Sequence, residues 1–447
     1  MVRFSSADPR TAARGEWLFD RIVATGSLVV RELGGGRHGE VAAHRYLSSP
    51  HVSVPIIVEA LSERTRLAAV GRRVVVAQDT TEINFSGRGA ARRGLGPGGD
   101  GESRGFFIHP SVAIDADQET LLGLVGGQIW TRAEGKVGPR HQRDAPDKES
   151  HRWVQGSQKA AALVGHAPQV IDVSDREGDV WAHIAHLPPG LELASRARHD
   201  RPLEGGATLF TALADQPPLA TTLVRVSPQK IGEKARTAEV IVRAGKVRIT
   251  RPARAPRTDP EVLQMGLVEA IERDPPEGTE PLLWRILTTL PVADAQAAQE
   301  VVRLYRLRWR IEEVFRALKK DGLALEDTQV QDGERLFRLA ALALGAAVRI
   351  LQLVDARDGG SRPMSDVLDQ SLTPLVAILV RDRERPTAKQ QNPHPEGSLA
   401  WLSWVVARYG GWNCYGKPPG PKTMARGWQK LSATLTGVIL AKARELP

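Results

Sequence analysis

The sequence predicts an α/β protein with helical regions at both ends, and two kinds of pattern support that prediction. Val74–Ala77 and Val170–Ser174 have the signature of strands that are buried on both faces of a sheet. Helix-like spacing follows in Trp153–Val164 and, more strongly, from Ala295 to Leu353. Strands separated by helices indicate a mixed α/β domain.

The pattern of apolar and polar residues along the chain divides it into three parts. Residues 1–65 and 361–447 favour helices joined by polar turns, whereas residues 66–360 contain the α/β pattern. Within the central part, residues from about 192 to 290 alternate like β-strands, which indicates an insertion into the α/β domain. With 447 residues, 41% of them hydrophobic, the chain is long enough for two or three domains.

Composition and charge narrow the class of partner and the compartment. The chain carries 61 Lys and Arg against 52 Asp and Glu, a net charge of +9, which favours polyanions such as nucleic acid. The single cysteine, Cys414, excludes an intramolecular disulfide and fits a reducing compartment. The first residues lack an apolar signal core, and the most apolar run, Leu339–Leu353, is interrupted by Arg349. We therefore expect a soluble cytoplasmic protein.

A carboxylate follows each of the two predicted buried strands. Asp79 comes directly after the first strand, and Asp175 comes directly after the second. Ligands of open α/β sheets gather just beyond the strand ends, and two acids there would repel each other without a cation between them. Carboxylate oxygens suit Mg²⁺ or Mn²⁺. Either acid alone could cap a turn or a helix, but their matching contexts favour a metal site.

A third polar group falls in the helical part of the chain. One predicted helix carries Tyr305, Arg308, Glu312, Arg316 and Lys319. At about 100° per residue, Tyr305 and Glu312 lie about 20° apart, and Lys319 lies about 40° from Tyr305. One stripe would therefore present a phenol, a carboxylate and several cations. The alternative is a solvated face with ordinary ion pairs along the helix.

These motifs resemble those of a known family. The segment Tyr305–Lys319 resembles the Tyr-(2)-Arg-(3)-Glu-(6)-Lys signature of cut-and-paste transposases of the insertion-sequence-four group, the relatives of transposon five. Asp79-Thr-Thr-Glu is similar to the family's first acidic motif, and Asp175-Arg-Glu-Gly-Asp to its second. The three motifs stand in the family's order, and the resemblance extends from about residue 7 to near the C-terminus.

The resemblance implies a fold and a separate function for each part of the chain. It implies an RNase H-like catalytic domain over residues 66–360, interrupted by the β-rich insertion. Residues 1–65 would be a DNA-binding region, and residues 361–447 would mediate dimerisation. The implied partners are double-stranded DNA, namely the inverted-repeat ends of a transposon and a target, and a second copy of the chain once assembled on DNA. Such a protein would be associated with the nucleoid.

The resemblance also implies the metal ligands and the reaction. Asp79, Asp175 and Glu312 would bind two divalent ions, Mg²⁺ or Mn²⁺, with Asp79 bridging them. In two-metal sites one ion generates the nucleophile and the other stabilises the leaving oxygen. Water would attack the phosphodiester at the transposon end, the freed 3′-hydroxyl would form a hairpin, and the 3′-ends would finally attack target DNA.

The resemblance also implies DNA-contacting roles for the residues that occupy matching positions in the motifs. Tyr305, Arg308 and Lys319 would contact phosphates, which position a strand without reading its sequence. Trp284 matches the family's base-stacking tryptophan, and stacking on an aromatic face contributes about 1–3 kcal/mol per base. The alternative for Trp284 is a core residue of a strand.

Two further basic residues and one acid have both a functional and a structural interpretation. Arg196 and Arg198 match residues that approach the bound DNA end in relatives, although either could be an ordinary surface charge. Asp179, within the second acidic motif, could orient neighbouring groups or cap the next helix, and the structural role is favoured.

Two alternative functions remain open at this point. The chain could be a shortened transposase product that binds DNA and inhibits transposition without cutting. It could also be a metal-dependent nuclease that cleaves DNA but does not join it. The presence of all three acids argues against the inhibitor, because binding alone does not require them. Only the family resemblance and Trp284 separate a transposase from a nuclease.

Overall fold

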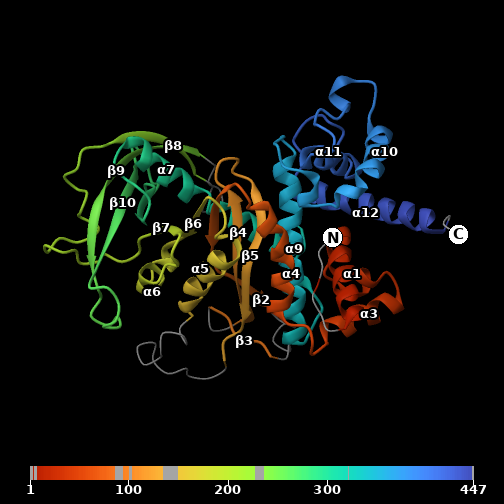
Figure 1. Ribbon diagram of the computed structural model, residues 1–447, viewed down its shortest axis with the longest axis horizontal. Helices are drawn as coiled ribbons and strands as arrows, with labels where there is room; N and C mark the ends of the chain where they lie inside the picture. Colours follow the sequence, from red (N-terminus) through yellow and green to blue (C-terminus); the bar gives the residue numbers. More distant parts are fainter. Residues whose placement is uncertain are drawn as a thin grey trace. The chain divides into compact units, whose positions relative to one another are not determined.

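The computed structural model describes residue 4 and residues 8–85, 94–99, 103–133, 149–226, 236–320 and 322–444. The chain forms two compact units, each assembled from separate stretches of sequence (Figure 1). Unit 1 consists of Met1–Val70, Thr80–Val137 and Arg310–Pro447, and unit 2 consists of Gly71–Asp79 and Gly138–Trp309. Strands and helices occur in both units, so the predicted mixed α/β class is confirmed.

Unit 1 is built around the long helix α9 (Gly333–Ala356). The elements packed against it are α1 (Pro9–Thr25), α3 (Arg37–Leu47), α4 (Val54–Ala68), α11 (Leu399–Tyr409), α12 (Pro421–Arg444) and β5 (Leu121–Trp130). By length and composition α9 could cross a membrane, but 83% of its most apolar window is buried against these neighbours. Arg349, which interrupts the apolar run, is itself buried and donates to the Val367 carbonyl at 2.8 Å.

Side-chain caps explain where several of these helices begin. Asp8 accepts a hydrogen bond from the Arg10 backbone N–H at the start of α1, where Pro9 stands in the first helical position. Ser53 accepts from the Ile56 N–H at the start of α4. Such caps satisfy backbone donors that have no partner within the helix.

A small antiparallel sheet completes the core of unit 1. Its central strand β4 (Arg104–Asp115) pairs with β2 (Thr81–Phe85), with the short β3 (Gly96–Pro97) and with β5. The other helices of the unit are α2 (Val30–Gly34), α8 (Trp309–Lys319, from Arg310 on) and α10 (Thr373–Arg383), with the 3₁₀ turns η5 (Leu325–Asp327), η6 (Met364–Asp366), η7 (Gln370–Leu372) and η8 (Ala388–Gln390).

Unit 2 contains a mixed sheet whose strands run in the order β1-β6-β7-β11-β10-β9-β8. β1 (Arg73–Gln78), β6 (Gln169–Ser174) and β7 (Leu191–Arg196) are parallel. The remaining strands are antiparallel to their neighbours: β11 (Leu283–Thr288), β10 (Val262–Glu272), β9 (Arg236–Thr250) and β8 (Ala220–Val226). The helices of the unit are α5 (His151–Val164), α6 (Trp181–Ala185) and α7 (Ala295–Arg306), with the 3₁₀ turn η4 (Arg176–Gly178).

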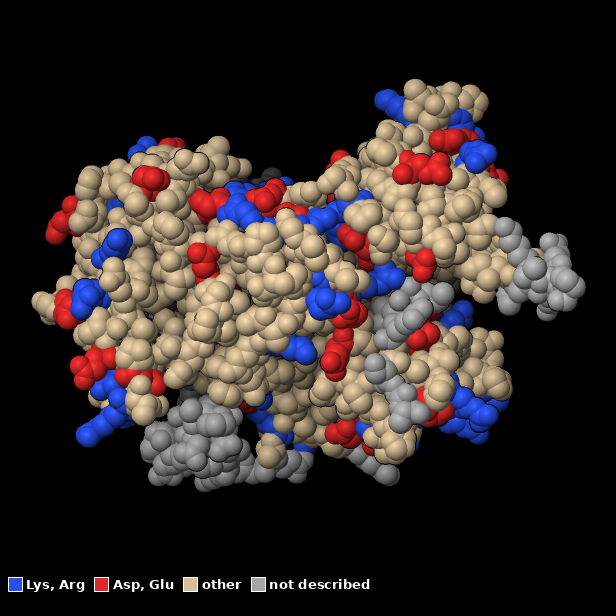
Figure 2. Space-filling model, viewed as in Figure 1, with Lys and Arg blue, Asp and Glu red and all other residues tan. Residues whose placement is uncertain are grey.

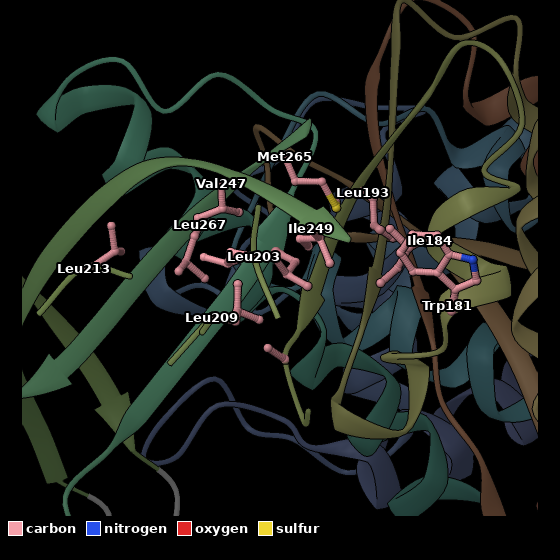
Figure 3. Packing of buried hydrophobic residues seen from close by; sticks show 12 residues of the cluster. Trp181, Ile184, Leu193, Leu203, Leu209, Leu213, Val247, Ile249, Met265 and Leu267 are labelled. Carbon is pink, nitrogen blue, oxygen red and sulfur yellow. The ribbon is translucent and has the colours of Figure 1, made fainter. Parts of the chain in front are cut away.

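The β-rich part of unit 2 shares one hydrophobic core with the parallel strands (Figure 3). Trp181 and Ile184 of α6 and Leu193 of β7 belong to the same cluster as Ile249 of β9 and Met265 of β10. Full burial of an apolar side chain of this size stabilises a fold by about 1.5–3 kcal/mol. The segment predicted as an insertion is thus packed onto the parallel strands as part of one unit.

The prediction of one continuous helix carrying Tyr305 and Glu312 is wrong. α7 ends at Arg306, and the Leu307 and Arg308 N–H groups bond three residues back, to the Leu304 and Tyr305 carbonyls, each at 3.1 Å. Such 3₁₀-type bonds wind the backbone more tightly than an α-helix. The α-helical count therefore does not continue through this turn, and α8 starts afresh at Trp309.

Candidate active site

The two strand-end acids lie at equivalent positions on neighbouring strands. In the parallel pair β1 and β6, Ala77 is the register partner of Val173. Asp79 and Asp175 each follow that pair by two residues, and neighbouring strands are about 4.8 Å apart. Asp79 is buried and Asp175 is half-buried. The two strands that precede these acids are thus parallel neighbours in the sheet.

Asp79 is held by an arginine from the turn between α7 and α8. Arg308 Nη1 donates to Asp79 Oδ2 at 2.8 Å, and each residue is only 7% exposed. A charge-assisted hydrogen bond of this kind is stronger than one between neutral groups. In this structure the Arg308 guanidinium is therefore directed at a carboxylate, and its contact with a DNA phosphate stays a prediction.

Tyr305 and Trp284 pack against each other next to this pair. Their rings meet edge to face, with centroids 5.2 Å apart, and both residues are buried. Burial raises the pKa of Tyr305; the nearby Arg308 and Arg196 partly oppose this rise, and the charge of Asp175 adds to it. The phenol is therefore a hydrogen-bond donor at neutral pH. Stacking of a DNA base on Trp284, which lies on β11, requires its ring to be uncovered first and stays a prediction.

The two candidate arginines near the end of β7 have different environments. Arg196 is half-buried and donates to the Leu283 carbonyl at 2.8 Å. Burial lowers the pKa of Arg196, although the neighbouring Tyr305 acts in the opposite direction. Arg198 is exposed, so its guanidinium is open to solvent and to a phosphate. The two arginines, which have the same interpretation from sequence, therefore differ in exposure and in hydrogen bonding.

Asp179 has the structural role that was favoured. Its carboxylate accepts from the backbone N–H groups of Arg198 and His199 at 2.7 and 2.9 Å and forms an ion pair with Arg201 at 2.5 Å. The second acidic motif therefore fixes the loop that carries Arg198. Asp175 itself accepts from the Glu177 N–H at 2.8 Å and so also caps the turn η4.

The remaining predicted residues belong to unit 1. Glu312 is half-buried in the first turn of α8, and Lys319 is in its last turn. Burial lowers the pKa of Lys319, while the charges of Glu326 and Glu82 oppose this. Glu326, which lies in η5, belongs to no motif in the sequence, whereas Glu82 stands in the first acidic motif.

The strand-end pair has the donor chemistry of a hard divalent cation. Within the described parts of the chain, no group of three or more His, Cys, Asp and Glu side chains is placed to hold a metal ion. Asp79 and Asp175 are the acids that one unit brings together by itself. Mg²⁺ is commonly bound through one or two carboxylates, with water and substrate phosphate oxygens completing its shell. Two carboxylates at adjacent strand ends fit that requirement.

A groove of unit 2 lies at the opposite end of β1. It has a volume of about 720 Å³, and its lining includes Arg73, Arg303, Arg306, Gln299 and Glu300. Arg73 and Arg303 are both paired with Glu300, at 3.0 and 2.7 Å, so this acid balances one of the three arginine charges of the groove. On the face of the molecule in Figure 2, basic side chains are likewise interspersed with acidic ones.

A comparison with known families bears on this arrangement. Residues 191–349 match the family model of the transposase DDE domain. The matched range runs from β7 into α9 and contains Trp284, Tyr305, Arg308 and Glu312. The match supports a DDE transposase, and with it DNA as the substrate and a dependence on divalent metal. Asp79 and Asp175 precede the matched range.

Proposed function

We propose that this chain catalyses cut-and-paste DNA transposition of the insertion-sequence-four type. The observation that supports this best is the placement of Asp79 and Asp175 at matching ends of two parallel strands, in a chain whose residues 191–349 match the transposase DDE domain. The α/β architecture is compatible with an RNase H-like catalytic domain, as that match implies.

In this proposal Asp79, Asp175 and Glu312 would hold the divalent ions, two Mg²⁺ or Mn²⁺. Bound divalent ions make water a nucleophile at neutral pH and stabilise the charge of an in-line displacement at phosphorus. Arg308 orients the Asp79 carboxylate through its 2.8 Å contact. Tyr305 and Lys319 hold the phosphates of the strand under attack, as donors.

The proposed reaction proceeds through four displacements at phosphorus. A water oxygen bonds to the phosphorus at the transposon end, and the 3′-oxygen leaves and takes up a proton. That 3′-hydroxyl then attacks the opposite strand to give a hairpin, with a base stacked on Trp284. After water opens the hairpin, the 3′-hydroxyl attacks target DNA. No protein nucleophile is needed.

Assembly belongs to the same proposal. Residues 1–65 contribute to holding the transposon end, with Arg196 and Arg198 near that end, and residues 361–447 mediate a homodimer on DNA. The cellular setting would be the cytoplasm, in association with the nucleoid.

The decisive experiment uses purified protein and DNA that carries the inverted repeats of its element. With Mg²⁺ or Mn²⁺, we expect nicked, hairpin and joined products on denaturing gels. Asp79→Ala and Glu312→Ala should reduce all three by more than about a hundredfold, because even groups one shell away from a metal contribute about 10- to 100-fold. Asp215→Ala, at an exposed acid, is the matched control.

The outcomes separate the three candidate functions. Cleavage without joined products would favour the nuclease. DNA binding without cleavage, in either metal, would favour the inhibitor and overturn the proposed activity. Equal activity in Asp79→Ala would overturn the assignment of the site.

A further inference from the structure

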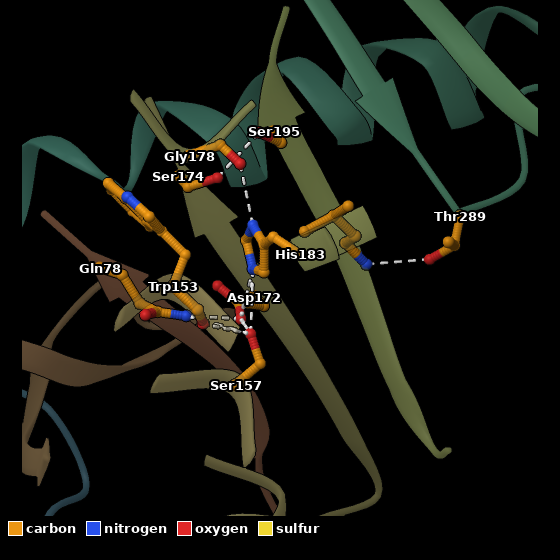
Figure 4. A network of polar contacts seen from close by, with 10 residues as sticks. Gln78, Trp153, Ser157, Asp172, Ser174, Gly178, His183, Ser195 and Thr289 are labelled. Carbon is orange, nitrogen blue, oxygen red and sulfur yellow. Dashed lines mark hydrogen bonds and ion pairs between the residues drawn. The ribbon is translucent and has the colours of Figure 1, made fainter. Parts of the chain in front are cut away.

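Four buried polar side chains meet behind the ends of β1 and β6 (Figure 4). Gln78 is the last residue of β1, Ser157 lies on α5, Asp172 on β6 and His183 on α6. Each is at most 1% exposed. Burial of so many polar groups at one point is unfavourable unless they bond to one another.

Hydrogen bonds link all four side chains through one carboxylate oxygen. Asp172 Oδ2 accepts from Gln78 Nε2 at 2.6 Å, contacts Ser157 Oγ and lies 3.4 Å from His183 Nε2. Ser157 Oγ is 2.9 Å from His183 Nε2. The other ring nitrogen, Nδ1, is 2.9 Å from the Gly178 carbonyl. A carbonyl oxygen can only accept, so Nδ1 carries a proton.

The charge of His183 follows from its neighbours. Burial by itself lowers the pKa of His183, but the hydrogen bond and charge of Asp172 outweigh burial, and the Gly178 carbonyl and Asp179 act in the same direction. The pKa is therefore raised above its ordinary value, which favours an imidazolium paired with the Asp172 carboxylate. Both partners are fully buried.

A net gain in folding stability does not explain why these polar side chains are buried together. A buried ion pair contributes little net stability compared with apolar residues of similar volume. In addition, Asp172 Oδ1 is buried and has no hydrogen-bond partner among the described residues, which costs free energy. A purely structural core at this place would be at least as stable with apolar side chains.

The position of the network relates it to both candidate metal ligands. Gln78 directly precedes Asp79, and Gly178 ends the turn that starts at Asp175. The surroundings leave Gln78 little freedom, because a Cβ at Gly156 of α5 would lie 1.8 Å from its Oε1. The network thus includes a residue next to Asp79 and contacts the backbone of the turn that starts at Asp175.

We propose that the network of His183, Asp172, Ser157 and Gln78 is a positioning device that fixes the backbone beside Asp79 and Asp175 so that both carboxylates can share a divalent cation. The inference rests on the proposed function for the metal and goes beyond it in assigning a role to residues outside the acidic triad. Hydrogen-bond partners of metal ligands commonly contribute about 10- to 100-fold to metal affinity or activity.

Four variants test the positioning role. Ser157→Ala removes one hydroxyl, Asp172→Asn removes the charge, and Gly156→Ala displaces Gln78 without changing any member of the network. His166→Gln, in the exposed turn that follows α5, is the control. For each, Mn²⁺ affinity is measured by calorimetry, DNA affinity by fluorescence anisotropy, the cleavage rate in single turnover, and folding by thermal denaturation.

The network acts through the backbone and not by a direct bond to either acid, so we expect Mn²⁺ affinity and cleavage rate to fall about 10-fold in the three network variants, the lower end of the range for partners of metal ligands, with DNA affinity unchanged within about twofold. Folded network variants that bind Mn²⁺ and cleave like the control would overturn the positioning role. If Asp172→Asn does not fold, the other two variants give the answer.

Mn²⁺ binding separates this inference from the proposed function. If the native chain binds Mn²⁺ through Asp79 but does not cleave DNA, the transposase proposal fails, and weaker Mn²⁺ binding in the network variants still supports positioning. A native chain without Mn²⁺ affinity would overturn both.

Discussion

At the scale of the residue, the contact between Arg308 and Asp79 determines how a buried carboxylate is balanced before any metal binds. The two groups are 229 residues apart in sequence and 2.8 Å apart in the structure. Removal of one partner of a buried ion pair leaves the other charge without compensation. Arg308 therefore stabilises the protein and also competes with a cation for Asp79.

Arg308→Ala should destabilise the metal-free protein by about 3–5 kcal/mol, the usual cost of breaking a buried pair. Mn²⁺ should recover part of this loss, because a bound cation replaces the missing guanidinium beside Asp79. Urea denaturation with and without Mn²⁺ measures both effects. Arg198→Ala, at an exposed arginine, should change the unfolding free energy by less than about 0.5 kcal/mol. A deficit that Mn²⁺ leaves unchanged would contradict this interpretation.

His183 makes the stability of the protein depend on pH. Its folded-state pKa is raised, so above the ordinary value of about 6.5 the folded chain retains a proton that the unfolded chain has lost. This contribution to the unfolding free energy is fully present below that pH and is lost as the pH rises through the folded-state pKa. In urea titrations between pH 6 and 9, His183→Gln should show a smaller decline with pH than the native chain. An unchanged slope would mean that His183 is neutral.

The sequence indicated the two strand-end acids, because each follows an apolar run whose burial is evident from its residues. It did not indicate the network, because Ser157, Asp172 and His183 look like ordinary polar residues of three separate elements. The contact of Arg308 with Asp79 was equally hidden, since it depends on tertiary structure and not on local spacing.

At the scale of the element, a largely buried arginine anchors the start of α8, in addition to the buried apolar side chains of this helix. Arg310 pairs with Asp355 of α9, whose Oδ2 also accepts from the Leu121 N–H of β5 at 2.7 Å. The anchor lies two residues from Glu312. A loss of this contact would free the start of α8, which carries the third candidate ligand.

Asp355→Ala should destabilise the protein by about 1–3 kcal/mol, because it removes one of the two carboxylates paired with the largely buried Arg310, leaving Glu313, and also the acceptor of the Leu121 N–H. The matched control is Asp358→Ala, since Asp358 is 71% exposed in its pair with Arg357 and such pairs contribute at most about 1 kcal/mol. Guanidinium denaturation of both variants measures the difference. Equal effects would show that Arg310 does not anchor α8.

Local sequence signals predicted some helices and strands, but they did not predict the break between α7 and α8. Predictions for β1 and α5 hold because a continuous apolar run and helix-like apolar spacing are local signals. The break at Leu307 and Arg308 has no proline or glycine to announce it. At this break Tyr305 is buried and Arg308 bonds to Asp79. Both contacts depend on the tertiary structure, so local sequence does not indicate them.

At the scale of the whole molecule, the net charge of +9 should govern the affinity for DNA. Binding should weaken as salt rises, with each phosphate contact adding about 0.9 to the slope of log K against log salt. We expect Arg198→Ala to reduce this slope by about one, because Arg198 is exposed. Arg196→Ala should change it less, because that side chain is held by Leu283. Fluorescence titrations over a range of KCl concentrations measure the slopes, and the reverse order would exclude Arg198 as the phosphate contact.

The interleaving of the two units along the chain has a consequence for synthesis on the ribosome. β1 belongs to unit 2, but its parallel partner β6 is encoded much later. At about 5–20 residues per second, roughly 90 further residues must be made before the two strands can pair. During those seconds Val74–Ala77 lacks its parallel partner β6, and we expect this apolar segment to be more available to chaperones and to other nascent chains than in the folded protein. The same parallel pairing that brings Asp79 beside Asp175 would thus delay the burial of an apolar strand during synthesis.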